Sequence, residues 1–178
     1  MLTIELVPQS CFYSNLRNAV EKSDWDRLRH EVYAKTANKC SICGGRGPRW
    51  PLECHETWEY DDINGIQKLV GLVGLCPACH EVKHFGRAQT IGREAEALAH
   101  LMKVNGWNER QAGRHISDSF EVWSRRSEED WKQDLSWASG KIRKWKDHAT
   151  RNRAIAAGFE EIAKGKRDRA VAEELMED

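Results

Sequence analysis

Four cysteines of this 178-residue chain form two pairs with the same spacing, Cys-x-x-Cys. The first pair is Cys40 and Cys43, and the second is Cys76 and Cys79. Each pair spans one tight turn, so two pairs that meet can place four thiolates at the corners of a tetrahedron, the geometry of zinc. A zinc ion with four protein ligands has no open position and stabilises the fold without catalysing a reaction. We therefore expect these four cysteines to bind a structural Zn²⁺.

Three histidines lie near these cysteines in the sequence. His55 falls in a predicted strand, and His80 and His84 fall in a predicted helix that begins at the second cysteine pair. The spacing of four residues puts His80 and His84 on one face of that helix. Imidazoles bind divalent ions, and an accessible ion polarises a phosphate and stabilises a leaving oxygen. We expect His55, His80 and His84 to bind a second divalent ion.

The elements that would position these side chains are a hairpin and a helix. Alternating apolar residues predict strands over Trp50–Tyr60 and Gln67–Leu75, joined by a turn rich in Asp, Asn and Gly. Pro77 suits the first turn of a helix, and Gly86 predicts that this helix stops soon after His84. The hairpin would bring the second cysteine pair back to the first.

The flanking segments are predicted to be mostly helical. Periodicity and capping residues predict a short strand or an extended arm at Leu2–Val7 and helices at Asp24–Ala37, Glu94–Val104 and Asn108–Trp123. A capping box at Ser127–Asp130 predicts a further helix that carries Trp131.

We predict an α+β protein with four regions. These are an N-terminal arm and helix (1–39), a zinc-bound core (40–88), a helical region packed on that core (89–138), and a charged helical extension with an acidic tail (139–178).

The combined pattern resembles the zinc-ribbon-containing HNH endonucleases over about residues 40–86. The matching residues are Cys40-x-x-Cys43, Leu52-Glu-Cys-His55-Glu56 and Leu75-Cys-Pro-Ala-Cys-His80-x-x-x-His84. The resemblance implies a ββα-metal (His-Me finger) core that holds one catalytic ion, which would be Mg²⁺, Mn²⁺, Zn²⁺ or Ni²⁺. It also implies metal-dependent hydrolysis of phosphodiester bonds in DNA, less often in RNA.

The same resemblance implies roles for individual residues. His55, on the strand, and His80 and His84, on the helix, match ligands of the catalytic ion. Glu56 stands in the position of the general base, which is usually a histidine in the family. In an alternative register Cys54 is the ligand and His55 is the base.

Two other functions compete with that of an active nuclease. Because Glu56 replaces histidine and Gly71 stands near the family's central asparagine, the chain could instead be a catalytically inactive zinc module that binds nucleic acid or a partner protein. The sequence His80-Glu-x-x-His84 also matches the zinc metalloprotease motif, in which Glu81 would be the base. The cysteine pair Cys76 and Cys79 at the start of this helix favours the nuclease over the protease.

Charge and composition indicate the binding partners and the cellular location expected for the protein. The chain has 28 Lys and Arg and 28 Asp and Glu, so nucleic acid would need a local basic face. We expect that face at Lys141, Arg143, Lys144 and Lys146, which would contact phosphates. The absence of a long apolar stretch or a signal peptide predicts a cytoplasmic protein without a membrane partner. A homodimer is a further expectation, because a double-strand break requires two cuts.

Overall fold

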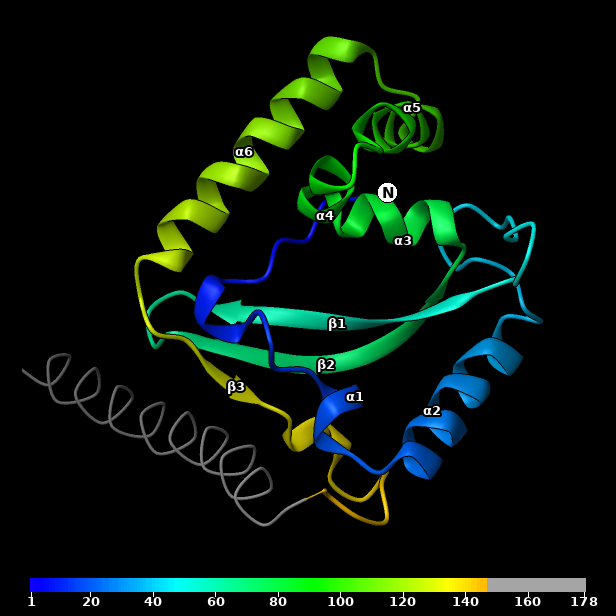
Figure 1. Cartoon of the computed structure of the whole chain (residues 1–178), viewed down its shortest axis with the longest axis vertical. Helices are drawn as coiled ribbons and strands as arrows, with labels where there is room; N and C mark the ends of the chain where they lie inside the picture. The colour runs from blue at the N-terminus through cyan, green and yellow to red at the C-terminus, as the bar shows by residue number, and fades with distance from the viewer. Residues whose placement is uncertain (147–178) are drawn as a thin grey trace, which may run out of the picture.

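The computed structural model describes residues 1–146 and has an α+β fold, as the sequence predicts (Figure 1). The strands are β1 (Glu53–Asp61), β2 (Ile66–Leu75) and β3 (Lys132–Asp134). The helices are α1 (Leu16–Ala19), α2 (Lys22–Lys35), α3 (Pro77–Lys83), α4 (Phe85–Thr90), α5 (Glu94–Asn105) and α6 (Glu109–Ser127), with short 3₁₀ turns at Gln9–Cys11 and Ser136–Ala138. Figure 1 shows α3 to α6 on one side of the sheet and α1 and α2 on the other.

The predicted hairpin is confirmed. Strands β1 and β2 pair antiparallel along their lengths, with one irregularity between Thr57 and Trp58. The side chain of Asp61 accepts hydrogen bonds from the backbone amides of Ile63 and Asn64, each at 3.0 Å, and so closes the turn that the Asp and Asn residues predict. Strand β3 adds to β2 in parallel, giving the order β1-β2-β3. Within residues 1–146, β1 therefore has a free edge.

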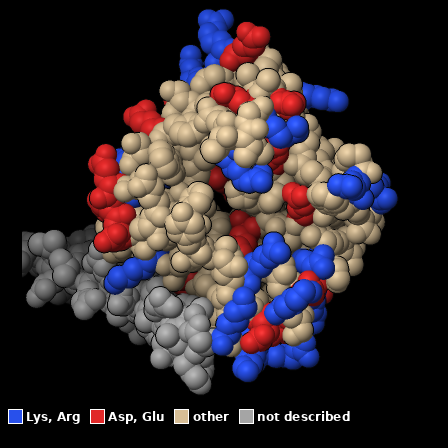
Figure 2. Space-filling view, viewed as in Figure 1, with Lys and Arg blue, Asp and Glu red and all other residues tan. Residues whose placement is uncertain are grey.

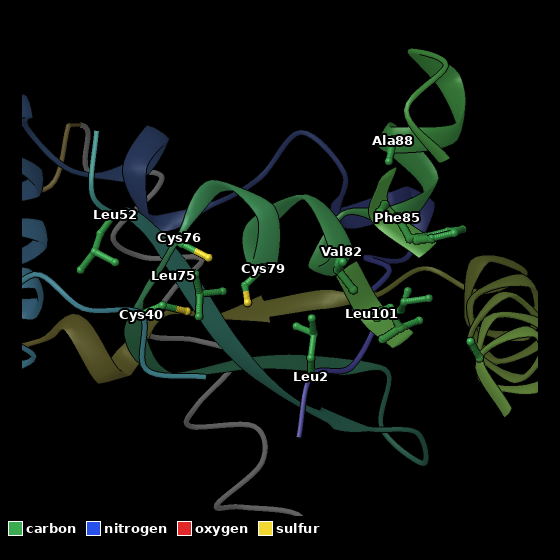
Figure 3. Packing of buried hydrophobic residues seen from close by; sticks show 13 residues of the cluster. Leu2, Cys40, Leu52, Leu75, Cys76, Cys79, Val82, Phe85, Ala88 and Leu101 are labelled. Atoms are coloured by element: carbon green, nitrogen blue, oxygen red, sulfur yellow. The ribbon is translucent and has the colours of Figure 1, made fainter. Parts of the chain in front are cut away.

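The sheet separates two apolar clusters. One cluster packs Leu75 of β2 against Val82 of α3 and Leu101 of α5, as Figure 3 shows. The other cluster packs Leu69, also of β2, against Trp25 of α2. Burying each such side chain contributes about 1.5–3 kcal/mol, so both faces of the hairpin are fixed by packing.

Helix α3 ends at Lys83, directly before the second of the two histidines, His84. It begins at Pro77, as predicted, and His84 leaves the helical conformation with φ −99° and ψ 45°. The chain then turns into α4, where Phe85 is completely buried and Gly86 forms part of the helix. His80 and His84 therefore lie one turn apart at the end of α3.

The helix predicted after the capping box at Ser127–Asp130 is wrong. Helix α6 extends to Ser127, and the chain continues as strand β3. The Ser127 hydroxyl accepts a hydrogen bond from the amide of Gln9 at 3.2 Å, and the indole of Trp131 donates to the carbonyl oxygen of Arg126 at 2.6 Å. Trp131 is buried, and its tertiary contacts outweigh the local preference for a helix.

The N-terminal residues form an extended arm that is not a strand of the sheet. The amide of Glu5 donates to the carbonyl oxygen of Lys83 at 3.0 Å, which ties the arm to the end of α3. The following segment adds a 3₁₀ turn and α1, neither of which the sequence patterns predicted. Helix α2 begins at Lys22 and ends at Lys35, two residues earlier at each end than predicted.

The segment 139–146 also differs from the prediction, because it forms turns and not a helix. Asp24, which is 1% exposed, accepts hydrogen bonds from the amides of Arg143 and Lys144 at 2.8 and 3.0 Å. The rest of the predicted extension, with its acidic tail, lies outside the described residues. Among the helices of residues 1–146, none is long and apolar enough to cross a membrane.

Candidate functional site

The two cysteine pairs meet, and their four sulfur atoms lie within 4.8 Å of one another. Cys40 and Cys43 lie in the loop after α2, and Cys76 and Cys79 lie at the start of α3. The sulfur atoms of Cys43 and Cys76 are 3.6 Å apart. Zinc–sulfur bonds of about 2.3 Å in a tetrahedron place the sulfurs about 3.8 Å apart, so the cluster fits zinc. Figure 3 shows the sulfurs of Cys40, Cys76 and Cys79 converging beside Leu75.

The environment of the thiols favours a bound cation. Burial opposes ionisation of Cys40, but amide hydrogen bonds from Cys43, Cys76 and Ile42 lower its pKa to about 7. Burial raises the pKa of Cys76 to about 11, and burial together with the charge of Cys40 raises the pKa of Cys79. The charge of one thiolate thus disfavours ionisation of the next thiol, and a bound divalent cation would offset this repulsion between thiolates.

The three histidines also meet, as a separate cluster. His55 projects from β1, and His80 and His84 project from the end of α3. One ring nitrogen of each lies within 4.8 Å of the others, and the Nε2 atoms of His80 and His84 are 3.2 Å apart. Metal–nitrogen bonds of about 2.0–2.1 Å in a tetrahedron place the nitrogens about 3.4 Å apart, so these imidazoles fit a divalent ion.

Two glutamates hold the rings of this cluster. The Nδ1 atom of His80 donates to Glu53 Oε2 at 2.6 Å, which leaves Nε2 free to bind a metal ion. The Nε2 atom of His55 donates to Glu5 Oε2 at 2.8 Å, and the other oxygen of Glu5 accepts a hydrogen bond from Lys83. Carboxylates that accept from the second ring nitrogen fix the tautomer and orientation of histidines that bind metals.

The helical histidines are held neutral, as metal ligands must be. Burial lowers the pKa of His84 to about 3, with further lowering by the charges of His80 and His55. Burial, followed by the charge of His55, also lowers the pKa of His80, against the opposing effect of Glu53. At neutral pH both rings therefore present a lone pair.

Glu56, the residue predicted as the base, lies on the other face of β1 from His55, as strand alternation requires. Its Oε1 accepts a hydrogen bond from the amide of Arg17 at 3.2 Å. Burial raises the pKa of Glu56 to about 7, although the amides of Arg17 and Leu16 oppose that shift. Cys54, the ligand of the alternative register, lies on the same face as Glu56 and outside both clusters, and burial raises its pKa to about 12.

A cavity of about 1,040 Å³ joins these two faces around the free edge of β1. The three histidines and Glu56 line it, together with residues of the N-terminal segment, α4 and α6. Figure 2 shows this hollow near the centre of the view, with acidic atoms inside it and basic atoms at its rim. The histidine cluster is therefore open to a ligand, whereas three of the four cysteines are buried.

The predicted basic face is exposed but lies on a segment attached to α2, and its side chains do not line this cavity. Its residues are Lys141, Arg143, Lys144 and Lys146. The guanidinium of Arg143 donates to Asp24 at 3.2 Å, and the ammonium of Lys141 donates to the carbonyl oxygen of Trp137 at 2.6 Å. Part of the charge of this face is thus paired within the protein.

The protease interpretation receives no support from the position of Glu81. Both of its carboxylate oxygens accept from Arg93, at 2.5 and 3.1 Å, on the surface between α3 and α5. A base in that motif would need to face an ion-bound water beside His80 and His84. The hydrogen bonds to Arg93 fix this carboxylate in an ion pair.

Sequence patterns did not identify the supporting carboxylates. Glu53 belongs to the same strand face as His55, two residues away, so alternation could have indicated it. Glu5 lies 50 residues from His55 in the sequence, and nothing in the arm indicates that contact. No sequence pattern indicated that His100 of α5 lies 3.1 Å from the sulfur of Cys79.

Comparison of the chain with protein-family models, with curated proteins and with solved structures found no match. The function must therefore be inferred from the residues and their geometry.

Proposed function

We propose that this protein is a metal-dependent endonuclease of the HNH type, which hydrolyses phosphodiester bonds in DNA. The observation that carries the proposal is the joint placement of the two clusters on one hairpin and helix. The cysteines join the base of the hairpin to the start of α3, and the histidines join β1 to the end of α3. This is the order of elements that the ββα-metal core of that family requires.

The two clusters would have different roles in this reaction. His55, His80 and His84 would hold the catalytic ion, and Glu53 and Glu5 orient the rings of His80 and His55. When bound, the ion supplies a Lewis acid for the scissile phosphate and for the leaving oxygen. The four cysteines would hold zinc that fixes the hairpin against α3.

A water molecule in the cavity would be the nucleophile. Glu56 borders the same cavity as the histidines and is the carboxylate we assign as its base. A general base must reach the proton that it removes directly or through one water, so this assignment requires a water that reaches Glu56 around the edge of β1. His55 as the base is the second assignment, with His80 and His84 then binding the ion.

The test is nicking of supercoiled plasmid by zinc-loaded protein with added Mg²⁺, Mn²⁺, Ni²⁺ or Zn²⁺. We expect nicking in at least one of these ions, and a loss of at least about 100-fold in Glu56→Gln, the range for a general base. Glu59→Gln is the matched control, because Glu59 is exposed on the same strand and does not line the cavity.

The rival function is a zinc module that binds nucleic acid without cutting it. This rival predicts retention of DNA by the wild-type protein with no nicking in any of the four ions. Full nicking in the Glu56→Gln variant together with loss in His55→Ala would instead assign the base to His55.

A further inference from the structure

We infer that the cavity beside the histidine cluster binds an unpaired strand of DNA, with a base stacked on Phe12 and the backbone phosphates on Arg17 and Arg87. The inference rests on the proposed function for the role of the metal, but binding tests it independently of cleavage.

The first observation is an exposed aromatic pair at the cavity. Phe12 is 65% exposed and lines the cavity, and Tyr13 beside it is 86% exposed. Their rings meet edge to face, with centroids 5.2 Å apart, and the side chain of Phe12 stays mostly exposed beside Tyr13. An apolar ring kept in solvent at the mouth of a polar site is available to stack on a ligand.

The inner wall of the cavity is aromatic as well. Trp58 of β1 and Phe120 and Trp123 of α6 line it, and the indole nitrogen of Trp123 donates to the carbonyl oxygen of Val7 at 3.0 Å. These rings are half-buried, so they shape an apolar space beside the ion site. A volume of about 1,040 Å³ lies just above the usual range for ligand pockets, about 300–1,000 Å³.

Two arginines supply the charge that a backbone needs. Arg17 and Arg87 are exposed, line the cavity on opposite sides of β1, and have no ion pair or hydrogen bond from their guanidinium groups to another described residue. Arg87 of α4 follows His84 by three residues and lines the same cavity as His80 and His84. A strand that followed the cavity would therefore meet a cation on either side of the ion.

The same charges argue against a duplex as the preferred ligand. Duplex DNA has a high charge density, and its binding depends on neutralising many phosphates. This cavity offers two arginines, with Glu5 and Glu56 also in its lining, so much of the affinity must come from contacts with bases. Bases in a duplex are stacked on one another, whereas an unpaired base can place its face on an aromatic side chain.

The experiment measures binding of a labelled 12-nucleotide single strand and of the same sequence as a duplex. Zinc-loaded protein is used without a second divalent ion, so that no cleavage accompanies binding. We expect at least tenfold tighter binding of the single strand. Phe12→Ala should weaken single-strand binding by about 5- to 150-fold, the effect of losing one stacked base, and leave duplex binding unchanged.

Matched variants distinguish the effects of base stacking and of charge on DNA binding from nonspecific effects of a substitution. Ile63→Ala removes another exposed apolar side chain, at the β1–β2 turn outside the cavity, and should change nothing. Arg17→Gln and Arg87→Gln should each reduce the slope of log affinity against log salt by about 0.7. Arg110→Gln, about 20 Å along α6 from Trp123, should leave that slope unchanged.

Equal affinity for the two forms of DNA, or single-strand binding that Phe12→Ala does not alter, would overturn the inference. If nicking nevertheless requires Glu56, the nuclease proposal stands and only the strand preference fails. If Phe12 is needed for single-strand binding but no ion supports cleavage, the inference stands and the nuclease proposal fails.

Discussion

Glu53→Gln tests whether the histidine cluster is built to bind a metal ion. The carboxylate of Glu53 accepts two hydrogen bonds, from His80 Nδ1 at 2.6 Å and from the indole nitrogen of Trp50 at 2.9 Å. Both partners donate, and a glutamine amide has one oxygen to accept with. The variant keeps the shape of the side chain but cannot accept from His80 and Trp50 through separate oxygens.

The expected loss is a factor of about 10–100 in affinity for the ion at the histidines, the usual effect of removing a carboxylate that orients a metal-binding histidine. This corresponds to about 1.4–2.8 kcal/mol. Because the side chain of Glu53 is 31% exposed, solvent screening favours the lower end of that range. The assay is calorimetric titration of Ni²⁺ into zinc-loaded protein, in which the cysteine site is already filled.

A second substitution sharpens this test. Trp50→Phe removes the competing donor, so the single amide oxygen that Glu53→Gln introduces can accept from His80 alone, and the loss in the double variant should be smaller than in Glu53→Gln. Glu59→Gln, on the same strand, should bind Ni²⁺ as the wild type does. Wild-type affinity in Glu53→Gln would refute the argument that this carboxylate orients a metal ligand.

Three further predictions concern zinc, the buried aspartate and the basic face. Removing zinc with a chelator should unfold the protein, because structural zinc contributes about 10–16 kcal/mol, more than the stability of most domains. Circular dichroism measures the unfolding. The control variant Cys54→Ser should keep its zinc, because Cys54 lies outside the cluster. Asp24→Asn should lower the free energy of unfolding in urea by about 1.5–3 kcal/mol, because burial opposes its charge but hydrogen bonds from Lys144 and Arg143 hold its pKa below the usual value. Because the pKa of Asp24 is lowered in the folded protein, its contribution to stability is constant from pH 8 to 5 and is lost only as the pH falls below about 3.9. A difference in unfolding free energy between the wild type and Asp24→Asn that varies between pH 8 and 5 would contradict this prediction. Neutralising Lys141, Arg143, Lys144 and Lys146 together should reduce the salt dependence of DNA binding, and an unchanged slope would remove this face from the interface.

The sequence was sufficient for the elements whose patterns are local. The hairpin followed from alternation and from the Asp-Asn-Gly turn, and α6 begins directly after Asn108, the residue that the sequence predicts as its cap. Helix α5 ends as predicted, since Gly106 adopts a positive φ of 65° that glycine tolerates. The cysteine cluster and the histidine cluster were predicted because the spacing of these residues and the hairpin together fix which side chains meet.

The sequence was insufficient where a distant contact decides the structure. Asp24 stands at the start of a helix that the sequence predicts, but its burial was not predicted, because it depends on hydrogen bonds to a segment 119 residues later. Trp131 follows a good capping box and still enters an extended segment, since its ring packs on Tyr60 with centroids 5.6 Å apart. The contact of Glu5 with His55 depends on the path of the arm, which no local pattern encodes.

The proposal of a catalytic ion at the histidines is tested by comparing His80→Ala with the wild type in the plasmid nicking assay, with zinc content measured in both. We expect one zinc on the cysteines of each protein, nicking by the wild type that depends on a second divalent ion, and no nicking by the variant. Nicking by zinc-loaded His80→Ala at the wild-type rate, or no nicking by the wild type in any of the four ions, would contradict it.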